Sequence, residues 1–347
     1  MTRNDLARGN AHPLARLPHG LPILAAVLLF GLMSGRAAVA GSQIAVTTAY
    51  LSGGSTRLGY SLLSLDTGDY TTPAGSLVVM DLSPDGRRIV YRAGREMRVA
   101  NADGTEDRVV LEGLPSATTQ NRLRWSPTGD RVAFLHTNGI HLVSLSGAQL
   151  GAIVEPGVVA FDWSPDGRRI AYTQVQATNV PIPNPYRDGL KSILGSVGRF
   201  KVRELESQST RVLHESIPYV YWLDRDFVAY TSSGPSPAYL EWAPTGGRLA
   251  VGFAFQRQVV RASSGRPLAK PQGHEDAYTA ISVMDERSGA VSHLVVSHAS
   301  ALSPGHPVWS PDGTEILYSG GGEGLYVVDA GSGVAGMPKR GGNTHAG

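Results

Sequence analysis

The stretch from Asp162 to Tyr172, DWSPDGRRIAY, decides the fold. Pro165 fixes φ at about −65° in the first central position of a tight turn, Asp166 suits the second, and Gly167 takes the left-handed conformation that ends the turn. The segments on both sides are short and rich in β-branched and aromatic residues, which favours strands. The stretch therefore predicts a β-hairpin.

Four more copies of this pattern occur along the chain, and their turn glycines are spaced by 43, 38, 79 and 67 residues. This spacing indicates a repeat of about 40 residues, with some repeats lengthened or skipped. The copies are LSPDGRRIVY, RWSPTGDRVAF, EWAPTGGRLAV and VWSPDGTEILY. The residues assigned to the repeated turns are Pro84, Asp85, Gly86, Pro127, Gly129, Pro165, Asp166, Gly167, Pro244, Gly246, Pro311, Asp312 and Gly313.

A third strand and a turn of Asp, Ser and Gly follow each hairpin, as in IHLVSLSG ending at Gly147, and a fourth short apolar segment comes after it. Four antiparallel strands in about 40 residues are typical of a β-propeller blade. Six third-strand segments predict an all-β, six-bladed propeller. Seven blades are the alternative, because residues 219–233 contain a further hairpin-like segment. We expect a strand from Ile44 to complete the last blade and close the ring.

The first forty residues resemble a secretory signal peptide. Three arginines precede the apolar run Leu21–Met33, and Ala38, Val39 and Ala40 form a small-x-small cleavage pattern. The run is shorter than the roughly 20 residues of a membrane-spanning helix. We therefore expect cleavage after Ala40 and a periplasmic or secreted protein, with an uncleaved membrane anchor as the alternative.

The remaining chain divides into a propeller and a tail. We assign residues 41–335 to the propeller, with insertions near residues 174–200 and 255–278, and residues 336–347 to a flexible Gly-rich tail. Loops on a rigid scaffold are common binding sites, and both insertions carry charged residues. The residues expected to contact a partner are Tyr186, Arg187, Asp188, Lys191, Arg257 and Arg261.

The WSPDGRRIAY-type repeats resemble the β-propeller repeats of the TolB family, whose members are periplasmic components of the Tol-Pal system. They are also similar to the propellers of prolyl-oligopeptidase-type enzymes. The resemblance covers about residues 42–335. It implies a propeller standing alone, without the domain that precedes the propeller in TolB, and a role in the cell envelope.

Composition excludes several kinds of chemistry. The chain has no cysteine, so it has no disulfide, thiolate nucleophile or thiolate-bound metal. Lys and Arg total 31 against 29 Asp and Glu, a balance that provides no strong field for nucleic acid. Loss of residues 1–40 would remove four arginines and one aspartate and change the formal charge from +2 to −1.

No motif of a catalytic, metal or cofactor site stands out. The repeated aspartates occupy turn positions where Thr128 and Thr245 replace them in two copies, so we interpret them as turn residues. The histidines show no metal-ligand spacing. We therefore expect no catalysis, metal or cofactor, and a protein that binds a partner protein or envelope ligand through loops on one face. Two alternatives are a propeller hydrolase or lyase with a site at the mouth of the central channel, and a ligand-sensing propeller within a larger assembly.

Overall fold

The structure is a computed structural model that describes residues 12–15, 43–52, 55–64, 70–71, 78–102, 104–115, 123–181, 192–216, 219–222, 227–261, 278–298, 307–319 and 325–331. The predicted tail and most of the predicted signal peptide lie outside these residues. All the regular elements described are strands, and they pair antiparallel in six sheets.

The strand order within each sheet follows the chain almost throughout. The sheets are, in chain order, β2 (Gln43–Ser52), β3 (Ser55–Ser64) and β4 (Tyr70–Thr71); β5 (Val78–Leu82), β6 (Arg88–Ala93), β7 (Glu96–Asn101) and β8 (Arg108–Leu111); β9 (Leu123–Trp125), β10 (Arg131–His136), β11 (Gly139–Ser144) and β12 (Gln149–Val154); β13 (Val158–Trp163), β14 (Arg169–Pro181), β15 (Ser192–Glu204) and β16 (Thr210–Ser216); β17 (Tyr219–Trp222), β18 (Phe227–Trp242), β19 (Arg248–Arg261), β20 (Tyr278–Asp285) and β21 (Val291–His298); and β22 (Val308–Trp309), β23 (Glu315–Ser319) and β24 (Leu325–Asp329), with β1 (His12–Ala15) beside β24.

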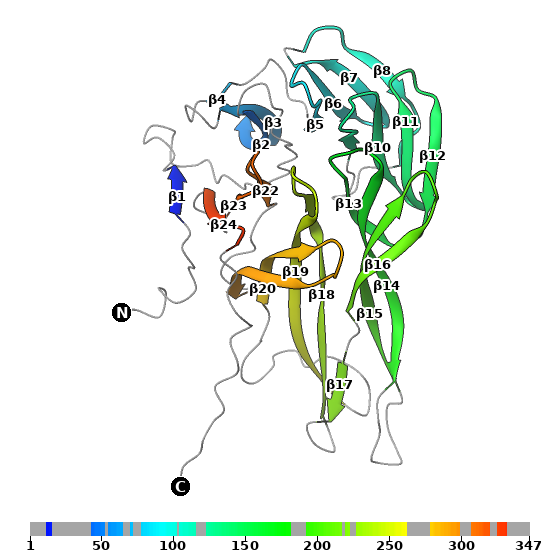
Figure 1. Ribbon diagram of the computed structural model, residues 1–347, viewed down its shortest axis with the longest axis vertical. Coiled ribbons are helices and arrows are strands. Elements are labelled where there is room, and N and C mark those ends of the chain that lie inside the picture. Colours follow the sequence, from blue (N-terminus) through cyan, green and yellow to red (C-terminus); the bar gives the residue numbers. More distant parts are fainter. Residues whose placement is uncertain are drawn as a thin grey trace.

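Five of these sheets have four or more strands and are the blades of a β-propeller. Consecutive sheets lie next to each other from β2–β4 to β22–β24 (Figure 1). The all-β propeller prediction is therefore confirmed, whereas the count of six blades, or seven, is wrong. β2, β3 and β4 form a three-stranded sheet instead of a blade, and β17 and residues 227–233 of β18 lie in the five-stranded sheet of β17–β21.

The strand that begins near Ile44 does not complete the last blade, as the sequence had suggested. It is part of β2, which pairs with β3 from Gln43↔Ser64 to Ser52↔Ser55. Only two residues separate these strands, so a local hairpin forms with a much smaller loss of chain entropy than pairing with the distant β24. The edge of β24 is instead occupied by β1, inside the segment predicted to be a signal peptide.

The five repeated turns share one geometry. In the turn from Ser164 to Gly167, the Gly167 N–H donates to the Ser164 carbonyl at 2.9 Å, and Gly167 has φ of +68°. A Cβ on Gly167 would lie 3.6 Å from Cδ of Pro127 in the preceding blade. Gly129 and Gly313 lie in the same way against Pro84 and Thr245 of the preceding turn, so three of the repeated turns pack against the turn of the blade before them.

The turn aspartates bind their own turns. The carboxylate of Asp312 accepts hydrogen bonds from the Ser310 hydroxyl at 2.6 Å and the Thr314 N–H at 3.0 Å. The hydrogen bond from Ser310 is the main reason that the pKa of Asp312 falls to about 2. Asp85 and Asp166 accept the same kind of hydrogen bond from Ser83 and Ser164.

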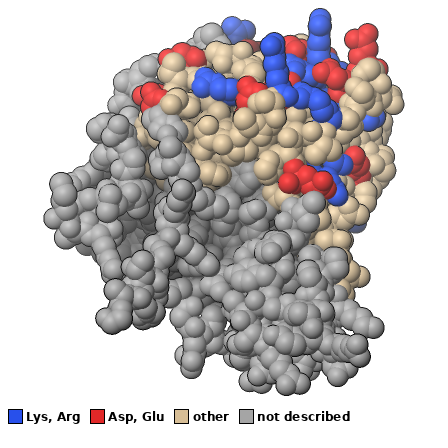
Figure 2. Space-filling model, turned by 60° about the horizontal axis from the view of Figure 1, so that its bottom comes forward, with Lys and Arg blue, Asp and Glu red and all other residues tan. Residues whose placement is uncertain are grey.

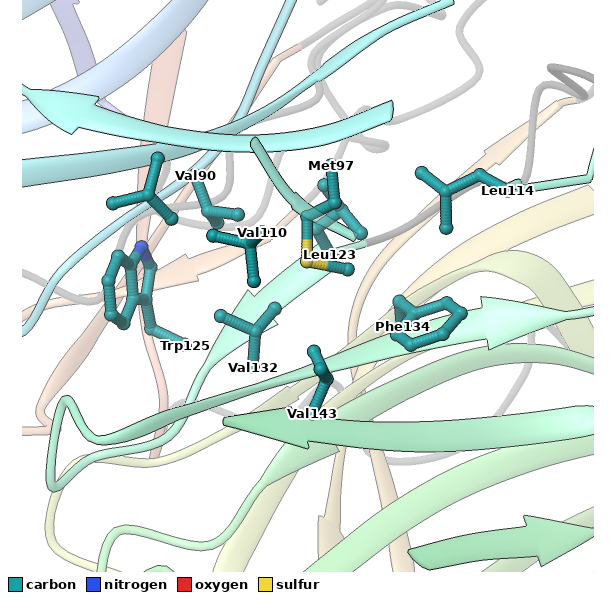
Figure 3. Close-up of a cluster of buried hydrophobic side chains, with 10 residues drawn as sticks. Val90, Met97, Val110, Leu114, Leu123, Trp125, Val132, Phe134 and Val143 are labelled. Atoms are coloured by element: carbon teal, nitrogen blue, oxygen red, sulfur yellow. The ribbon is translucent and has the colours of Figure 1, made fainter. Parts of the chain in front are cut away.

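The hydrophobic core lies between the blades. At the first interface, Val90, Met97 and Val110 of one blade face Trp125 and Phe134 of the next (Figure 3). Similar clusters fill the other interfaces between consecutive blades. No blade buries its own apolar side chains alone, so the blades stabilise one another.

An arginine stacks on a tryptophan at each of the four interfaces between consecutive blades. The arginine begins the strand that follows the repeated turn of one blade, and the tryptophan ends the strand that precedes the repeated turn of the next. The guanidinium carbon lies 5.0–5.5 Å from the ring centroid in the pairs Arg88–Trp125, Arg131–Trp163, Arg169–Trp242 and Arg248–Trp309. In the last pair, the guanidinium also donates to the Gly313 carbonyl at 2.6 Å.

We expect Arg248→Ala to lower the free energy of unfolding by about 1–2 kcal/mol, because it removes a cation–π contact and a charged hydrogen bond. Arg168→Ala is the matched control: Arg168 is an exposed arginine of a repeated turn, and its loss should cost less than about 0.5 kcal/mol. Urea unfolding followed by tryptophan fluorescence measures both. Equal losses in the two variants would contradict a specific role for the stacked pair.

Candidate functional site

Two hairpins extend far beyond their blades. In the first, β14 and β15 pair from Arg169↔Glu204 to Pro181↔Ser192, although the neighbouring strand β13 pairs only as far as Gln174. In the second, residues 227–235 of β18 pair with residues 253–261 of β19, and β17 adds a third strand. We call these extensions the paired ribbons: the first pairs residues 175–181 with residues 192–198, and the second pairs residues 227–235 with residues 253–261.

The paired ribbons belong to consecutive blades and lie side by side. β18 contacts both β14 and β15, and β17 contacts β14. Both ribbons point the same way, toward the bottom of Figure 1, away from β5–β8. Residues 175–181 and 192–198, within the first expected insertion, and residues 255–261, within the second, thus lie in paired strands on one side of the molecule.

The base of the first ribbon is anchored to its blade. The Val175 N–H donates to the Gly157 carbonyl at 2.8 Å, and the Gln174 side-chain amide donates to the Pro156 carbonyl at 3.0 Å. On the opposite strand, Arg199 pairs with Glu215 at 2.6 Å. The direction of the ribbon is therefore fixed where it leaves the scaffold.

The residues expected to contact a partner fall on these ribbons or beyond them. Arg257 and Arg261 lie on β19. Tyr186, Arg187, Asp188 and Lys191 lie outside the described residues, in the segment of chain that connects β14 to β15.

A polar cluster lies between the two blades that carry the ribbons. Ser282 on β20 is fully buried and shares a 2.7 Å hydrogen bond with Nδ1 of His293 on β21. His214 on β16 is near enough for its charge to lower the pKa of His293, although burial is the larger cause. Burial also lowers the pKa of His214. Both imidazoles are therefore held in their neutral form at neutral pH.

Sequence analysis did not bring these three residues together. The signal was present in the hairpin between β20 and β21: counting outward from its turn places Ser282 opposite His293. The position of His214 near His293 depends on the packing of two blades, and no local sequence pattern indicates it. A serine beside a histidine suggests a nucleophile and base, but Ser282 has no exposed surface from which to reach a substrate.

Charged residues on the inner strands are used in contacts between blades. The Asp81 carboxylate accepts the backbone N–H of Trp125 at 2.8 Å and lies 3.6 Å from the Arg124 guanidinium. Asp162 accepts the backbone N–H of Trp242 at 2.7 Å in the same way. Both carboxylates and both tryptophans are buried. These carboxylates therefore hold neighbouring blades together.

On the part of the surface that is coloured in Figure 2, basic and acidic side chains are interspersed, without a field of one sign among the described residues. Among the side chains that the structure describes, no three His, Asp or Glu residues are grouped as metal ligands. The described part of the chain also contains no helix long and apolar enough to span a bilayer.

No family model and no curated protein matches the chain. Similar solved structures include one named as "putative TolB" from Agrobacterium tumefaciens, at 17% identity over 82% of this chain and 86% of that one, with a TM-score of 0.44. Hydrazine synthase from Kuenenia stuttgartiensis is 13% identical over 87% and 76%, with a TM-score of 0.49. An oligogalacturonate lyase from Vibrio parahaemolyticus is 12% identical over 83% and 98%, with a TM-score of 0.35. The assignment of the fold rests on the blades of this chain itself.

We expect the protein to lose stability as the pH falls below about 6.5. His214 and His293 have lower pKa values when folded than when unfolded, so the unfolded chain takes up protons first and acid favours unfolding. The double variant His214→Phe/His293→Asn should therefore show a smaller fall in the urea midpoint between about pH 7.5 and about pH 5.5.

His141→Gln is the control for this measurement. The pKa of His141 is also lowered, mainly by burial, but the residue lies in a different blade. A pH dependence that follows His141 alone would contradict the role of the polar cluster.

Proposed function

We propose that this chain is an extracytoplasmic β-propeller that acts as a binding or scaffold module and holds a partner protein on its paired ribbons. The ribbons are the observation that supports this proposal. Two consecutive blades extend paired strands side by side in one direction, whereas β10 and β11, the strands equivalent to β14 and β15, are joined by a two-residue turn at Thr137 and Asn138. Two-stranded ribbons add little to the stability of a propeller, so the length of the paired ribbons indicates a role other than stabilising the fold.

The charges of the ribbon sequences suit a protein partner. Arg187, Lys191, Arg257 and Arg261 accompany Asp188 and Tyr186, a mixture of aromatic and charged residues that is common in protein interfaces. The inner strands and the polar cluster favour binding over catalysis, because their charged and nucleophilic groups are buried in contacts between blades.

Export by a cleaved signal peptide and a closed ring are parts of the same proposal. Cleavage after Ala40 would remove β1 and leave β24 with an open edge. We propose that another strand or a loop then covers this edge, since an open blade edge is a site of unwanted pairing. Mass spectrometry of the exported chain tests the cleavage: a chain that begins at Gly41 supports it, and one that retains residues 12–15 contradicts it.

Photo-cross-linking in the cell envelope tests the partner site. A photoreactive residue at Tyr186 should give a discrete adduct with another protein, whereas the same residue at Asn138, in the short equivalent turn, should not. Identical adducts from both positions, or none from position 186, would contradict the proposal.

Shortening the first ribbon provides a second measurement. Replacing residues 176–197 by Thr-Asn, the connection between β10 and β11, keeps Val175 bonded to Gly157 and leaves the blade strands intact. We expect this variant to fold and to lose at least about tenfold in affinity for the cross-linked protein, which corresponds to about 1.4 kcal/mol.

A further inference from the structure

Two histidines lie together at the short turn between β10 and β11. His136 is the last residue of β10 and pairs with Gly139 across the turn. Further along the same hairpin, His141 pairs with Phe134. Residues directly opposite each other, and residues two apart on one strand, share a face of a sheet. His136 and His141 therefore lie on the same face, next to the turn.

The rings of both histidines point a nitrogen at the same atom. Nδ1 of His136 and Nε2 of His141 each lie 2.8 Å from the side-chain oxygen of Asn138. The Thr137 hydroxyl lies 3.2 Å from Nδ1 of His136, and the centroids of the two imidazoles are 4.8 Å apart. Two ring nitrogens and one amide oxygen are thus gathered at one point. We call His136, Asn138 and His141 the turn site.

The turn site is open to solvent and rests on the hydrophobic core. Asn138 is exposed and both histidines are partly exposed, so an ion reaches these side chains without any opening of the fold. The His141 ring also packs against Phe134, with centroids 5.5 Å apart. Phe134 belongs to the hydrophobic cluster at the first interface between blades (Figure 3). The core therefore orients one of the two imidazoles.

We propose that the turn site binds a divalent transition-metal ion, with Nδ1 of His136, Nε2 of His141 and the side-chain oxygen of Asn138 as its ligands. Imidazole suits Cu²⁺, Zn²⁺ and Ni²⁺, whereas Ca²⁺ and Mg²⁺ take oxygen ligands. Cu²⁺ forms the most stable complexes of this series with a given set of ligands, so we expect it to bind most tightly. Water or a group from another molecule completes the coordination.

Binding needs only small movements of side chains. A bond from Zn²⁺ to an imidazole nitrogen is about 2.0–2.1 Å long, which is shorter than either hydrogen bond to Asn138. Each neutral imidazole has one unprotonated nitrogen, which binds the metal while the other ring nitrogen keeps the proton. Because both rings already point toward one place, little side-chain freedom is lost on binding.

The sequence did not indicate this site. The spacing of His136 and His141 matches no common metal-binding motif, so no metal was expected. The two residues come together because a two-residue turn joins their strands and places them on one face. The metal ligands are therefore a property of this hairpin, and the proposal does not depend on the paired ribbons.

Substitutions that keep the hydrogen bonds separate metal binding from a structural role. His136→Asn places an amide nitrogen near the position of Nδ1, and His141→Gln places one near the position of Nε2. Both variants still donate to Asn138, but each loses an imidazole. We expect each to bind Cu²⁺ at least about tenfold more weakly than the native chain. Isothermal titration of the full chain, with glycine present to keep free Cu²⁺ in solution, measures this. His274→Gln, which removes a histidine elsewhere in the chain, is the matched control and should leave the affinity unchanged.

Asn138→Asp tests the third ligand by a gain of affinity. This variant keeps an oxygen in the same place and gives it a negative charge, so it should bind Cu²⁺ at least about tenfold more tightly than the native chain. Electron paramagnetic resonance of bound Cu²⁺ identifies the other two ligands. The native chain should show coupling to two imidazole nitrogens, and His141→Gln should show coupling to one.

Three results would overturn the proposal. The first is equal Cu²⁺ affinity in the native chain, His136→Asn and His141→Gln. The second is a loss of affinity confined to the control His274→Gln. The third is an Asn138→Asp variant that binds no more tightly than the native chain, because the third ligand would then lie elsewhere.

The variant with the shortened ribbon separates this inference from the proposed function. It retains β10, β11 and their turn, so it should bind Cu²⁺ like the native chain. Failure of metal binding leaves the ribbon experiments unaffected, and failure of the ribbon experiments leaves the metal site unaffected.

Discussion

The arrangement of the blades depends on the stacking of an arginine from one blade on a tryptophan of the next. The tryptophan is buried between two sheets, and the arginine above it also reaches the turn of the neighbouring blade in two of the four pairs. One side chain therefore links the hydrophobic core to the turn surface. Because the same pair recurs at four interfaces, it imposes a similar relation between every two consecutive blades.

The local parts of this arrangement could be predicted from sequence, and the distant ones could not. The turn at Ser164–Gly167 is determined by a few neighbouring residues, so its position and its role were visible in the repeat. The pairing of β2 with β3 was also signalled by Gly53-Gly54, a pair typical of two-residue hairpins, but the expectation of ring closure led to a different assignment. The pairing of β1 with β24 joins segments at opposite ends of the chain, and no local sequence pattern indicates it.

In the candidate site, too, local features could be predicted from the sequence and contacts between distant segments could not. Broken spacing predicted insertions near residues 174–200 and 255–278, because a repeat makes additional residues easy to see. Their form as ribbons was not evident, since Pro181 and Gly195 are unusual within long paired strands. The cluster of Ser282, His293 and His214 could not be predicted in full, because it needs the packing of two sheets that are separate in sequence.

The stacked pairs also define where the repeated order stops. Leu82 stands at the tryptophan position of the first turn-bearing blade, and Glu315 stands at the arginine position of the last. These two blades therefore cannot form with each other the contact that joins every other consecutive pair of blades. The three-stranded sheet of β2, β3 and β4 lies beside the first of them. Repetition thus accounts for the order of five blades, and the residues that depart from the repeat decide how the two ends of the array are completed.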